Sequence, residues 1–387
     1  MTICFITGGL KPGSGGVADY TTLLALQCQQ MGHKAILIGI NDLDVDDFSE
    51  EIIEGVTVLR ISTNLSWSNK WDIASKFKRK YNLDWVSIQF VPYAFNNRGI
   101  FKDFLKGIKG FVSGINCHIN LHEIWIGEYP NAKFKERIIG CIQKKLIVQM
   151  INQTKPKVIN YSNAGAKTRL ERNNIKCSYL PIFSNIPIVK NTDKSWIMGR
   201  LAEASTLLSS RINSGFIFYG FFGSLHYDWP ARQLLERLRM YTSAQGKSPA
   251  LLHAGILPRN KSRWKELKKN YSGDWLIHSF GKLPEDEISH YIQGLNYGLT
   301  STPWDLVGKS GSVAAMVEHG VPVIVNTMGG TPGAPLIIQD DFQSLIIKAD
   351  EHLLLNLKQC KSCKPVINNL EKVALRFIDL LDQSNWR

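Results

Sequence analysis

Residues 303–326, PWDLVGKSGSVAAMVEHGVPVIVN, decide the fold, because they combine a polar loop, a short helix and a buried strand. Ser310 or Ser312 can cap the helix, which has an apolar face and ends at a glycine, and a strand follows at 321–325. The first N–H groups of a helix have no partner within it and favour an anion, and Lys309 adds positive charge beside them. The stretch predicts an anion site, although an ordinary helix–strand unit with a surface lysine fits the same spacing.

Working outward, strand and helix patterns alternate in two runs. We expect strands at 2–10, 34–40, 56–61, 85–90, 116–121 and 158–162 in the first run, and at 215–222, 250–256, 275–280 and 297–301 in the second. The alternation predicts an α/β protein of two Rossmann-like domains with parallel sheets facing an interdomain cleft. Residues 41–54 carry seven Asp or Glu and are expected to be a solvated, mobile connection. Residues 177–187 are expected to leave the first sheet.

A glycine-rich loop, KPGSGG at 11–16, follows the first expected strand and precedes a helix at about 17–31. Gly15 and Gly16 allow the backbone to approach a ligand closely, and the polar residues Asp19 and Tyr20 come directly after them. Because about four residues normally suffice for a strand–helix turn, we interpret the loop as a binding loop rather than a plain turn.

Polar residues follow other expected strands at the edge where ligands collect in open α/β sheets. They include Tyr93 in the loop 91–99, His122 with Glu123 after 116–121, and the loop GSLHYDW at 223–229. A histidine and a carboxylate at this edge can hydrogen-bond a sugar hydroxyl, although such residues also simply close loops.

The charge is concentrated in one part of the chain. The 387 residues carry a net charge of +13, and 44% of them are hydrophobic, which is typical of a globular protein. Between Arg98 and Lys176 there are 15 Lys or Arg against 5 Asp or Glu. In 101–111 and 133–146 they alternate with apolar residues, which favours either a surface for anionic lipid or a solvated basic face. No nucleic-acid recognition motif accompanies the charge, so no nucleic-acid partner is expected.

The seven cysteines are scattered, as expected in a reducing cytosol. Cys360-x-x-Cys363 is an isolated pair and does not by itself predict a zinc or redox site. The opening residues MTICFITGG lack a basic segment, and no apolar run is long enough to cross a bilayer. We therefore expect a cytoplasmic protein, with peripheral contact to the inner face of a membrane through the basic region 98–146 as a hypothesis.

Five segments, GGVADYTTLLALQCQQMGH, IQFVPYAFNNRG, LHEIW, LPIFSNIP and TPWDLVGKSGSVAAMVEHGVPVIV, resemble in order the GT-B, family-4 retaining glycosyltransferases. The resemblance covers nearly the whole chain. It implies an acceptor-side domain at 1–190, a donor-binding domain at 191–368, and a last helix at 369–387 that packs back toward the first domain. It also implies that the enzyme needs no metal or other cofactor, since side chains and helix N-termini neutralise the donor diphosphate.

The family's Glu-x7-Glu motif is absent, because Val307 and Ala315 stand at its two positions. We expect Asp305 to replace the first glutamate on the sugar, and Glu318 to reach the ribose from one turn further along the helix. Lys309 is expected to supply positive charge in place of an Arg and Lys pair missing from GSLHYDWPAR. The candidate catalytic residues are His122 and Lys309. The candidate donor-binding residues are Gly15, Gly16, Gly223, Ser224, Asp305, Ser310, Gly311, Ser312 and Glu318, and the acceptor-side candidates are Asp19, Tyr20, Tyr93 and Glu123.

The resemblance implies a retaining hexosyltransferase that moves a sugar from a nucleotide diphosphate sugar to a small-molecule, glycan or lipid-linked acceptor. Lys309 and the N–H groups of 310–312 would stabilise the leaving diphosphate, while His122 and the main chain of Gly329 and Gly330 would orient the sugar. Two other functions remain open. One is a sugar-nucleotide epimerase or phosphorylase on the same fold, and the other is a non-catalytic nucleotide-sugar-binding protein.

Overall fold

The computed structural model describes residues 1–11, 13, 15–129, 132–190, 195–204, 215–257, 261–329, 331, 333–360 and 362–385. The chain divides into two compact units. Unit 1 comprises Met1–Asn185 and Leu370–Arg387, and unit 2 comprises Ile186–Asn369. None of the described helices combines the length and the apolarity that a membrane span requires.

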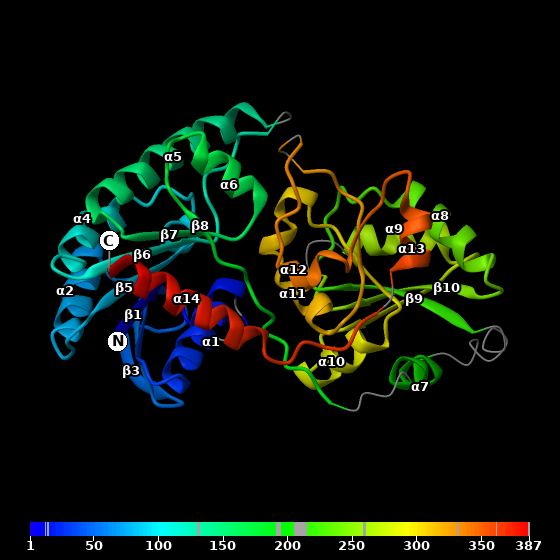
Figure 1. Cartoon of the computed structure of the whole chain (residues 1–387), viewed down its shortest axis with the longest axis horizontal. Helices are drawn as coiled ribbons and strands as arrows, with labels where there is room; N and C mark the ends of the chain where they lie inside the picture. The colour runs from blue at the N-terminus through cyan, green and yellow to red at the C-terminus, as the bar shows by residue number, and fades with distance from the viewer. Residues whose placement is uncertain are drawn as a thin grey trace. The chain divides into compact units, whose positions relative to one another are not determined.

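Unit 1 is built on an eight-stranded sheet in the order β3-β4-β2-β1-β5-β6-β7-β8 (Figure 1). Its strands are β1 (Thr2–Thr7), β2 (Lys34–Asp42), β3 (Phe48–Ile53), β4 (Val56–Ser62), β5 (Trp85–Phe90), β6 (Asn116–Leu121), β7 (Val158–Tyr161) and β8 (Ser178–Tyr179). Its helices are α1 (Gly16–Gln30), α2 (Trp67–Lys78), α3 (Pro92–Phe95), α4 (Lys102–Phe111), α5 (Phe134–Thr154), α6 (Ala164–Glu171) and α14 (Asn369–Asn385). The central strands are buried along most of their length, as expected for a sheet covered on both faces.

Two expectations for unit 1 are wrong. Residues 48–53 of the acidic segment are not a mobile connection, because they form β3, which pairs antiparallel with β4 and makes this sheet mixed rather than parallel. As an edge strand, β3 keeps most of its side chains in solvent, and Glu50 forms an ion pair with Lys80, so its acidic composition is compatible with a strand. The segment after residue 177 does not leave the sheet at once, since β8 adds a short parallel strand beside β7.

The C-terminal helix α14 packs in unit 1, although it follows unit 2 in sequence. Its apolar residues Val373, Phe377 and Leu381 belong to the same core cluster as Phe5 of β1 and Leu24 of α1. The rings of Phe5 and Phe377 lie 5.7 Å apart. In Figure 1 the red helix α14 lies beside α1. The last helix therefore completes the core under the first strand.

Unit 2 is built on a six-stranded parallel sheet in the order β11-β10-β9-β12-β13-β14. Its strands are β9 (Phe216–Phe222), β10 (Ser248–Ala254), β11 (Leu276–Gly281), β12 (Tyr297–Thr300), β13 (Val323–Val325) and β14 (Ile346–Lys348). Its helices are α7 (Ser195–Ala204), α8 (Ala231–Ser243), α9 (Lys261–Tyr271), α10 (Glu285–Gly294), the 3₁₀ helix η3 (Trp304–Lys309), α11 (Gly311–Glu318), α12 (Asp340–Gln343) and α13 (Leu353–Gln359). Along β9, Phe218 faces one core cluster and its neighbour Tyr219 faces the other, so both faces of the sheet are covered.

Each sheet has a point at which the strand order reverses. In unit 1, β1 lies between β2 and β5, and in unit 2, β9 lies between β10 and β12. At such a point, the connections from two neighbouring strands run to opposite sides of the sheet. They leave a crevice at the carboxyl ends of these strands, where open α/β sheets bind ligands. The glycine-rich loop after β1 and the residues after β9 and β12 stand at these two points.

Candidate functional site

In unit 2 the site begins at the N-terminus of α11. Ser310 is the N-cap, and its hydroxyl accepts a hydrogen bond from the backbone N–H of Val313 at 3.4 Å. Thr302, just after β12, donates to the Ser310 hydroxyl at 3.1 Å, and the Ser312 hydroxyl lies 3.1 Å from it as well. Of the two caps that the sequence allowed, the structure selects Ser310. Half-buried Lys309 ends η3 directly before this cap, so its positive charge adds to that of the helix terminus.

The loop after β9 lies against this helix tip. Gly223 has a φ of +85°, and a Cβ built on it would lie 3.7 Å from the Cβ of Ser312. Its N–H donates to the carbonyl of Ala254 at 2.9 Å, and its carbonyl lies 2.8 Å from Nε2 of His253. Burial lowers the pKa of His253, so the neutral ring uses one N–H to hold this carbonyl. The structure thus brings the predicted residues Gly223 and Ser312 together at the point where the strand order reverses.

Ser301 ties the same loop to β12. Its hydroxyl accepts from the N–H of His226 at 3.1 Å and donates to the carbonyl of Ser224 at 3.4 Å. Ser224 itself is exposed, as is Gly311 at the start of α11. Exposed main chain from the loop and from the helix start is therefore available side by side. The sequence analysis did not single out Ser301 and Thr302. Because a strand was expected at 297–301, these polar residues could have been recognised at its carboxyl end.

The two carboxylates expected to replace the Glu-x7-Glu motif have partners inside unit 2. Asp305 is 3% exposed and accepts from the N–H of Thr331 at 3.1 Å, so it holds the loop after β13. Glu318 is 5% exposed and accepts from the side chain of Asn369 at 2.7 Å. It ends α11, about 12 Å along the axis from the cap. We therefore correct both expectations and assign structural roles to these residues. Gly330 lies outside the described residues.

In unit 1 the glycine-rich loop leads into α1. Gly13 has a φ of +70°, and its N–H donates to Oδ1 of Asp19 at 2.9 Å, while Asn185 donates to Oδ2 at 3.2 Å. Gly15 and Gly16 are exposed, and a Cβ built on either would meet nothing within 4 Å. Asp19 therefore shapes the loop, whereas the two glycines leave its main chain open at the start of α1.

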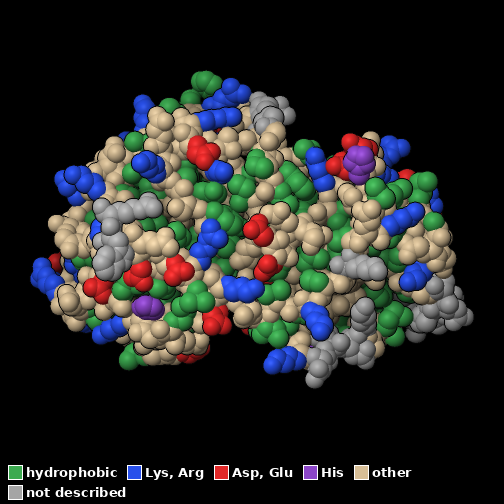
Figure 2. All heavy atoms as spheres, in the orientation of Figure 1, with side chains coloured by type: hydrophobic (Ala, Val, Ile, Leu, Met, Phe, Trp, Pro, Cys, Tyr) green, Lys and Arg blue, Asp and Glu red, His purple; other side chains and the backbone are tan. Residues whose placement is uncertain are grey.

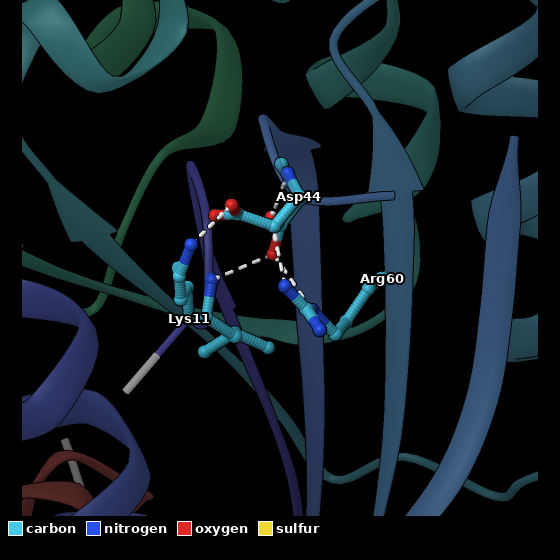
Figure 3. A network of polar contacts seen from close by, with 5 residues as sticks. Lys11, Asp44 and Arg60 are labelled. Atoms are coloured by element: carbon cyan, nitrogen blue, oxygen red, sulfur yellow. Dashed lines mark hydrogen bonds and ion pairs between the residues drawn. The ribbon is translucent and has the colours of Figure 1, made fainter. Parts of the chain in front are cut away.

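The base of this loop is anchored by the network shown in Figure 3. The buried carboxylate of Asp42 accepts from the N–H of Leu10 at 2.9 Å, from the N–H of Asp44 at 3.0 Å and from the guanidinium of Arg60. Lys11 is paired with Asp44. Burial alone would raise the pKa of Asp42, but the hydrogen bonds from Arg60 and the two N–H groups outweigh it, so the pKa is lowered. The start of the loop is thus fixed to β2 and β4.

His122 follows β6 and is buried, and its ring makes a T-shaped contact with the ring of Tyr20, with 4.9 Å between the ring centroids. Tyr20 in turn stacks on Phe183 at 4.5 Å and is 5% exposed. The expectation that Tyr20 faces an acceptor is therefore corrected, because it packs in the core and supports His122. Tyr93 in α3 is 40% exposed and Glu123 is half-buried, so these two acceptor-side candidates remain accessible.

Sequence reasoning also missed the buried polar residues that reach His122. Ser87 and Gln89 on β5 and His118 and Asn120 on β6 alternate with apolar residues in strands that are otherwise buried. Polar residues at every second position of a buried strand share one face, and this alternation was a readable signal. No group of three or more His, Cys, Asp or Glu placed to hold a metal occurs in the described ranges.

No protein-family model and no curated protein matches the sequence. The solved structures that are similar cover both units. They include sucrose-phosphate synthase from Thermosynechococcus elongatus, with a TM-score of 0.59 at 13% identity over 99% of this chain and 98% of that one. Anabaena HepE in complex with UDP and glucose has a TM-score of 0.56 at 12% identity, over 100% and 98%. The α,α-trehalose 6-phosphate synthase from Burkholderia multivorans has a TM-score of 0.52 at 10% identity, over 99% and 94%. At these identities the likeness establishes the fold, and the chain has the GT-B fold that the sequence predicts.

Proposed function

We propose that this protein is a retaining glycosyltransferase that moves a sugar from a nucleotide diphosphate sugar to an acceptor hydroxyl. The observation that carries the proposal is the tip of α11, where Lys309 and the Ser310 cap stand beside the Gly223 loop at the carboxyl ends of β9 and β12. Helix N-termini with an adjacent cation bind phosphate groups, and this one lies where open α/β sheets hold nucleotides.

In the proposed reaction, the diphosphate becomes the leaving group and gains negative charge in the transition state. Lys309 and the N–H groups at the start of α11 stabilise that charge, and they serve in place of a metal ion. His122 orients the transferred sugar, and Gly15 and Gly16 leave room for the donor phosphates or the acceptor. The acceptor is a hydroxyl on a small molecule, a glycan or a lipid-linked sugar.

The comparisons favour UDP-sugars as the first donors to test. The Anabaena HepE structures hold UDP, glucose and UDP-glucose, and a related structure from E. coli holds UDP-2-fluoro glucose. A thermal-shift series with UDP-, GDP-, ADP- and TDP-sugars, with and without EDTA, tests donor and metal dependence together. A ligand at about 100 times its Kd adds roughly 2.7 kcal/mol of stability to the folded state.

A product assay then separates the three functions. Release of nucleoside diphosphate that depends on an acceptor supports the transferase. A new nucleotide-sugar formed without an acceptor identifies an epimerase, and consumption of a glycan with phosphate identifies a phosphorylase. Donor binding without turnover across a broad set of acceptors contradicts the catalytic proposal and favours a binding protein.

We also propose that unit 1 contacts anionic membrane through the N-terminal part of α5. Phe134 is 80% exposed, and Ile138, one turn later on the same side, is 47% exposed. Lys133, Lys135 and Arg137 surround them and are exposed as well. Two apolar side chains ringed by basic ones suit the boundary between lipid headgroups and acyl chains.

The other basic segment does not have this form. In α4 the apolar residues Phe104, Leu105, Ile108 and Phe111 are buried, so the side chains that face solvent are its lysines and Asp103. Figure 2 shows Lys and Arg side chains spread over the face in view and interspersed with Asp and Glu. The basic side of α4 is therefore an ordinary solvated face. Of the two basic segments, only α5 is proposed to contact lipid.

Vesicle co-sedimentation tests this contact. We expect binding to phosphatidylglycerol vesicles but not to phosphatidylcholine vesicles, and a reduction of about ten-fold in the double variant Phe134→Ala/Ile138→Ala. Leu355→Ala, which alters a side chain that is 54% exposed on α13, is the matched control. Equal binding of the double variant and the control would contradict the proposal.

A further inference from the structure

A continuous chain of buried hydrogen bonds runs from His122 across unit 1. It passes through Gln89, Ser87, His118 and Asn160, and all of these side chains are at most 7% exposed. The parallel register of β5, β6 and β7 places them side by side, because Ser87 is paired with His118 and Asn160 with Asn120. The ring of Phe377, on α14, lies edge-on to the ring of His118 at 5.2 Å and helps to close the chain off from water.

The direction of the first link follows from the chemistry of its atoms. Nε2 of His122 lies 2.8 Å from Oε1 of Gln89. The same oxygen accepts from the side chain of Asn120 at 3.1 Å, while the amide nitrogen of Gln89 donates to Ser87 at 2.8 Å. An amide oxygen only accepts, so Nε2 of His122 carries the proton in this contact.

The remaining links point the same way. The Ser87 hydroxyl accepts from Gln89 and so directs its own proton to Nδ1 of His118, 2.8 Å away. Nε2 of His118 donates to Oδ1 of Asn160 at 2.8 Å, and the amide nitrogen of Asn160 donates to the carbonyl of Ser178 at 3.0 Å. Burial lowers the pKa of His118 to about 4, despite the hydrogen bond to Asn160, so its ring is neutral and has a single N–H to donate. A reversal at any one of these links would leave unmatched donors or acceptors. The amide nitrogen of Asn120 also lies 3.3 Å from Nε2 of His122, so Oε1 of Gln89, at 2.8 Å, is the nearer partner of this ring nitrogen.

We propose that Gln89 is a positioning residue for His122, holding the imidazole as the Nε2–H tautomer in one orientation for its contact with the transferred sugar. Ser87 and His118 keep the Gln89 amide in the required orientation. The tautomer is a property of this chain of side chains alone, whereas the sugar contact rests on the proposed transferase function. A histidine fixed in this way needs no reorganisation when the sugar binds.

The tautomer can be measured directly in the full-length protein labelled with ¹⁵N-histidine. Long-range ¹H–¹⁵N correlation spectra show which ring nitrogen carries the proton, and His122→Asn assigns the signal. We expect the proton of His122 on Nε2 in the wild type. In Gln89→Met, which removes the acceptor at similar volume, we expect a mixture of tautomers. A majority of Nδ1–H in the wild type would overturn the proposal.

Kinetics add the second readout. We expect Gln89→Met to lower kcat by about 10-fold or more, with donor affinity in the thermal-shift assay changed by less than about two-fold. Ser87→Ala should produce the same pattern more weakly, which keeps the test available if Gln89→Met folds poorly. Thr242→Val, which removes a buried hydrogen bond to Tyr219 in unit 2, is the control for general destabilisation. An unchanged tautomer and kcat in both unit 1 variants would refute the positioning role. If no donor binds, the result counts against the transferase function. The tautomer measurement would then still decide whether Gln89 positions His122.

Discussion

The guanidinium of Arg60 grips the carboxylate of Asp42 with two hydrogen bonds, from Nε at 2.9 Å and from Nη2 at 3.0 Å. The Asp42 side chain is 1% exposed and that of Arg60 is 17% exposed. Because Asp42 also accepts a hydrogen bond from the N–H of Leu10, this buried pair connects the core of unit 1 to the glycine-rich loop. Loss of the pair should lower the stability of unit 1 and release the start of the loop.

We expect Asp42→Asn to lower the stability of unit 1 by about 3 kcal/mol, because it leaves the Arg60 charge buried with a neutral partner. The pKa of Asp42 is lowered in the folded state, so its contribution is complete above the ordinary pKa and is lost as the pH falls through the lowered value. Urea unfolding at neutral and acidic pH measures this. Lys106→Ala, which breaks the exposed pair with Asp103, is the control and should change stability by less than about 1 kcal/mol. An Asp42→Asn protein as stable as this control would show that the pair contributes little.

Lys70 is a buried cation whose Nζ donates to Oδ1 of Asn41 at 2.6 Å and to the carbonyl of Thr63 at 3.2 Å. Among the described residues no carboxylate lies within ion-pair distance of it, and burial lowers its pKa to about 8. Between that value and the ordinary pKa the unfolded chain binds more protons than the folded one, so stability should rise with pH in this window.

The wild type should therefore gain about 2 kcal/mol from this group between about pH 7 and about pH 9.5, and Lys70→Met should lack that gain. Urea unfolding of both proteins at the two pH values gives the difference directly. Lys76→Ala, an exposed lysine on the same helix, serves as the control. Parallel pH profiles for the wild type and Lys70→Met would rule out a lowered pKa at Lys70.

For the transferase, Lys309→Ala should lower kcat by about 100-fold or more, since a charge that acts on the leaving diphosphate counts most in the transition state. The donor KM should change less. Lys265→Ala, on the exposed side of α9 in the same unit, should leave both constants unchanged. Steady-state kinetics with the donor found by thermal shift measure this, and a Lys309→Ala enzyme with wild-type kcat would remove Lys309 from the mechanism.

Gly329 lies against the carboxylate of Asp305 so closely that a Cβ built on it would be 1.8 Å from Oδ1. Gly329→Ala should therefore displace Asp305 or the loop and destabilise unit 2 by about 1 to 3 kcal/mol. If the clash is the cause, the double variant Asp305→Ala/Gly329→Ala should be more stable than the sum of the two single effects predicts. Unfolding of the wild type, the two single variants and the double variant gives this coupling energy. If the two effects simply add, the clash with Asp305 is not the reason that Gly329→Ala destabilises unit 2.

The sequence by itself determined the alternation of strands and helices in two runs and the helix tip at Lys309–Ser312. Short helices and buried strands have local signals, such as the Ser310 cap and the nearly continuous apolar residues of β9. These signals lie in neighbouring residues, and they suffice to predict two Rossmann-like domains. The GT-B fold was implied by the resemblance to known glycosyltransferases. Where local composition was the only guide, as in the acidic residues of β3, the prediction was wrong, because strand pairing at a sheet edge depends on a partner elsewhere.

Only the tertiary structure decided what the polar side chains do. Asp305 and Glu318 have carboxylates suited to a sugar site, yet their partners Thr331 and Asn369 come from distant segments and bury them. The alternation along β5 places Gln89 on one face of the sheet, but Gln89 reaches His122 only because β5 and β6 are neighbours in register. A hydrogen bond depends on distance and direction between two groups, and for groups far apart in sequence the fold alone sets both.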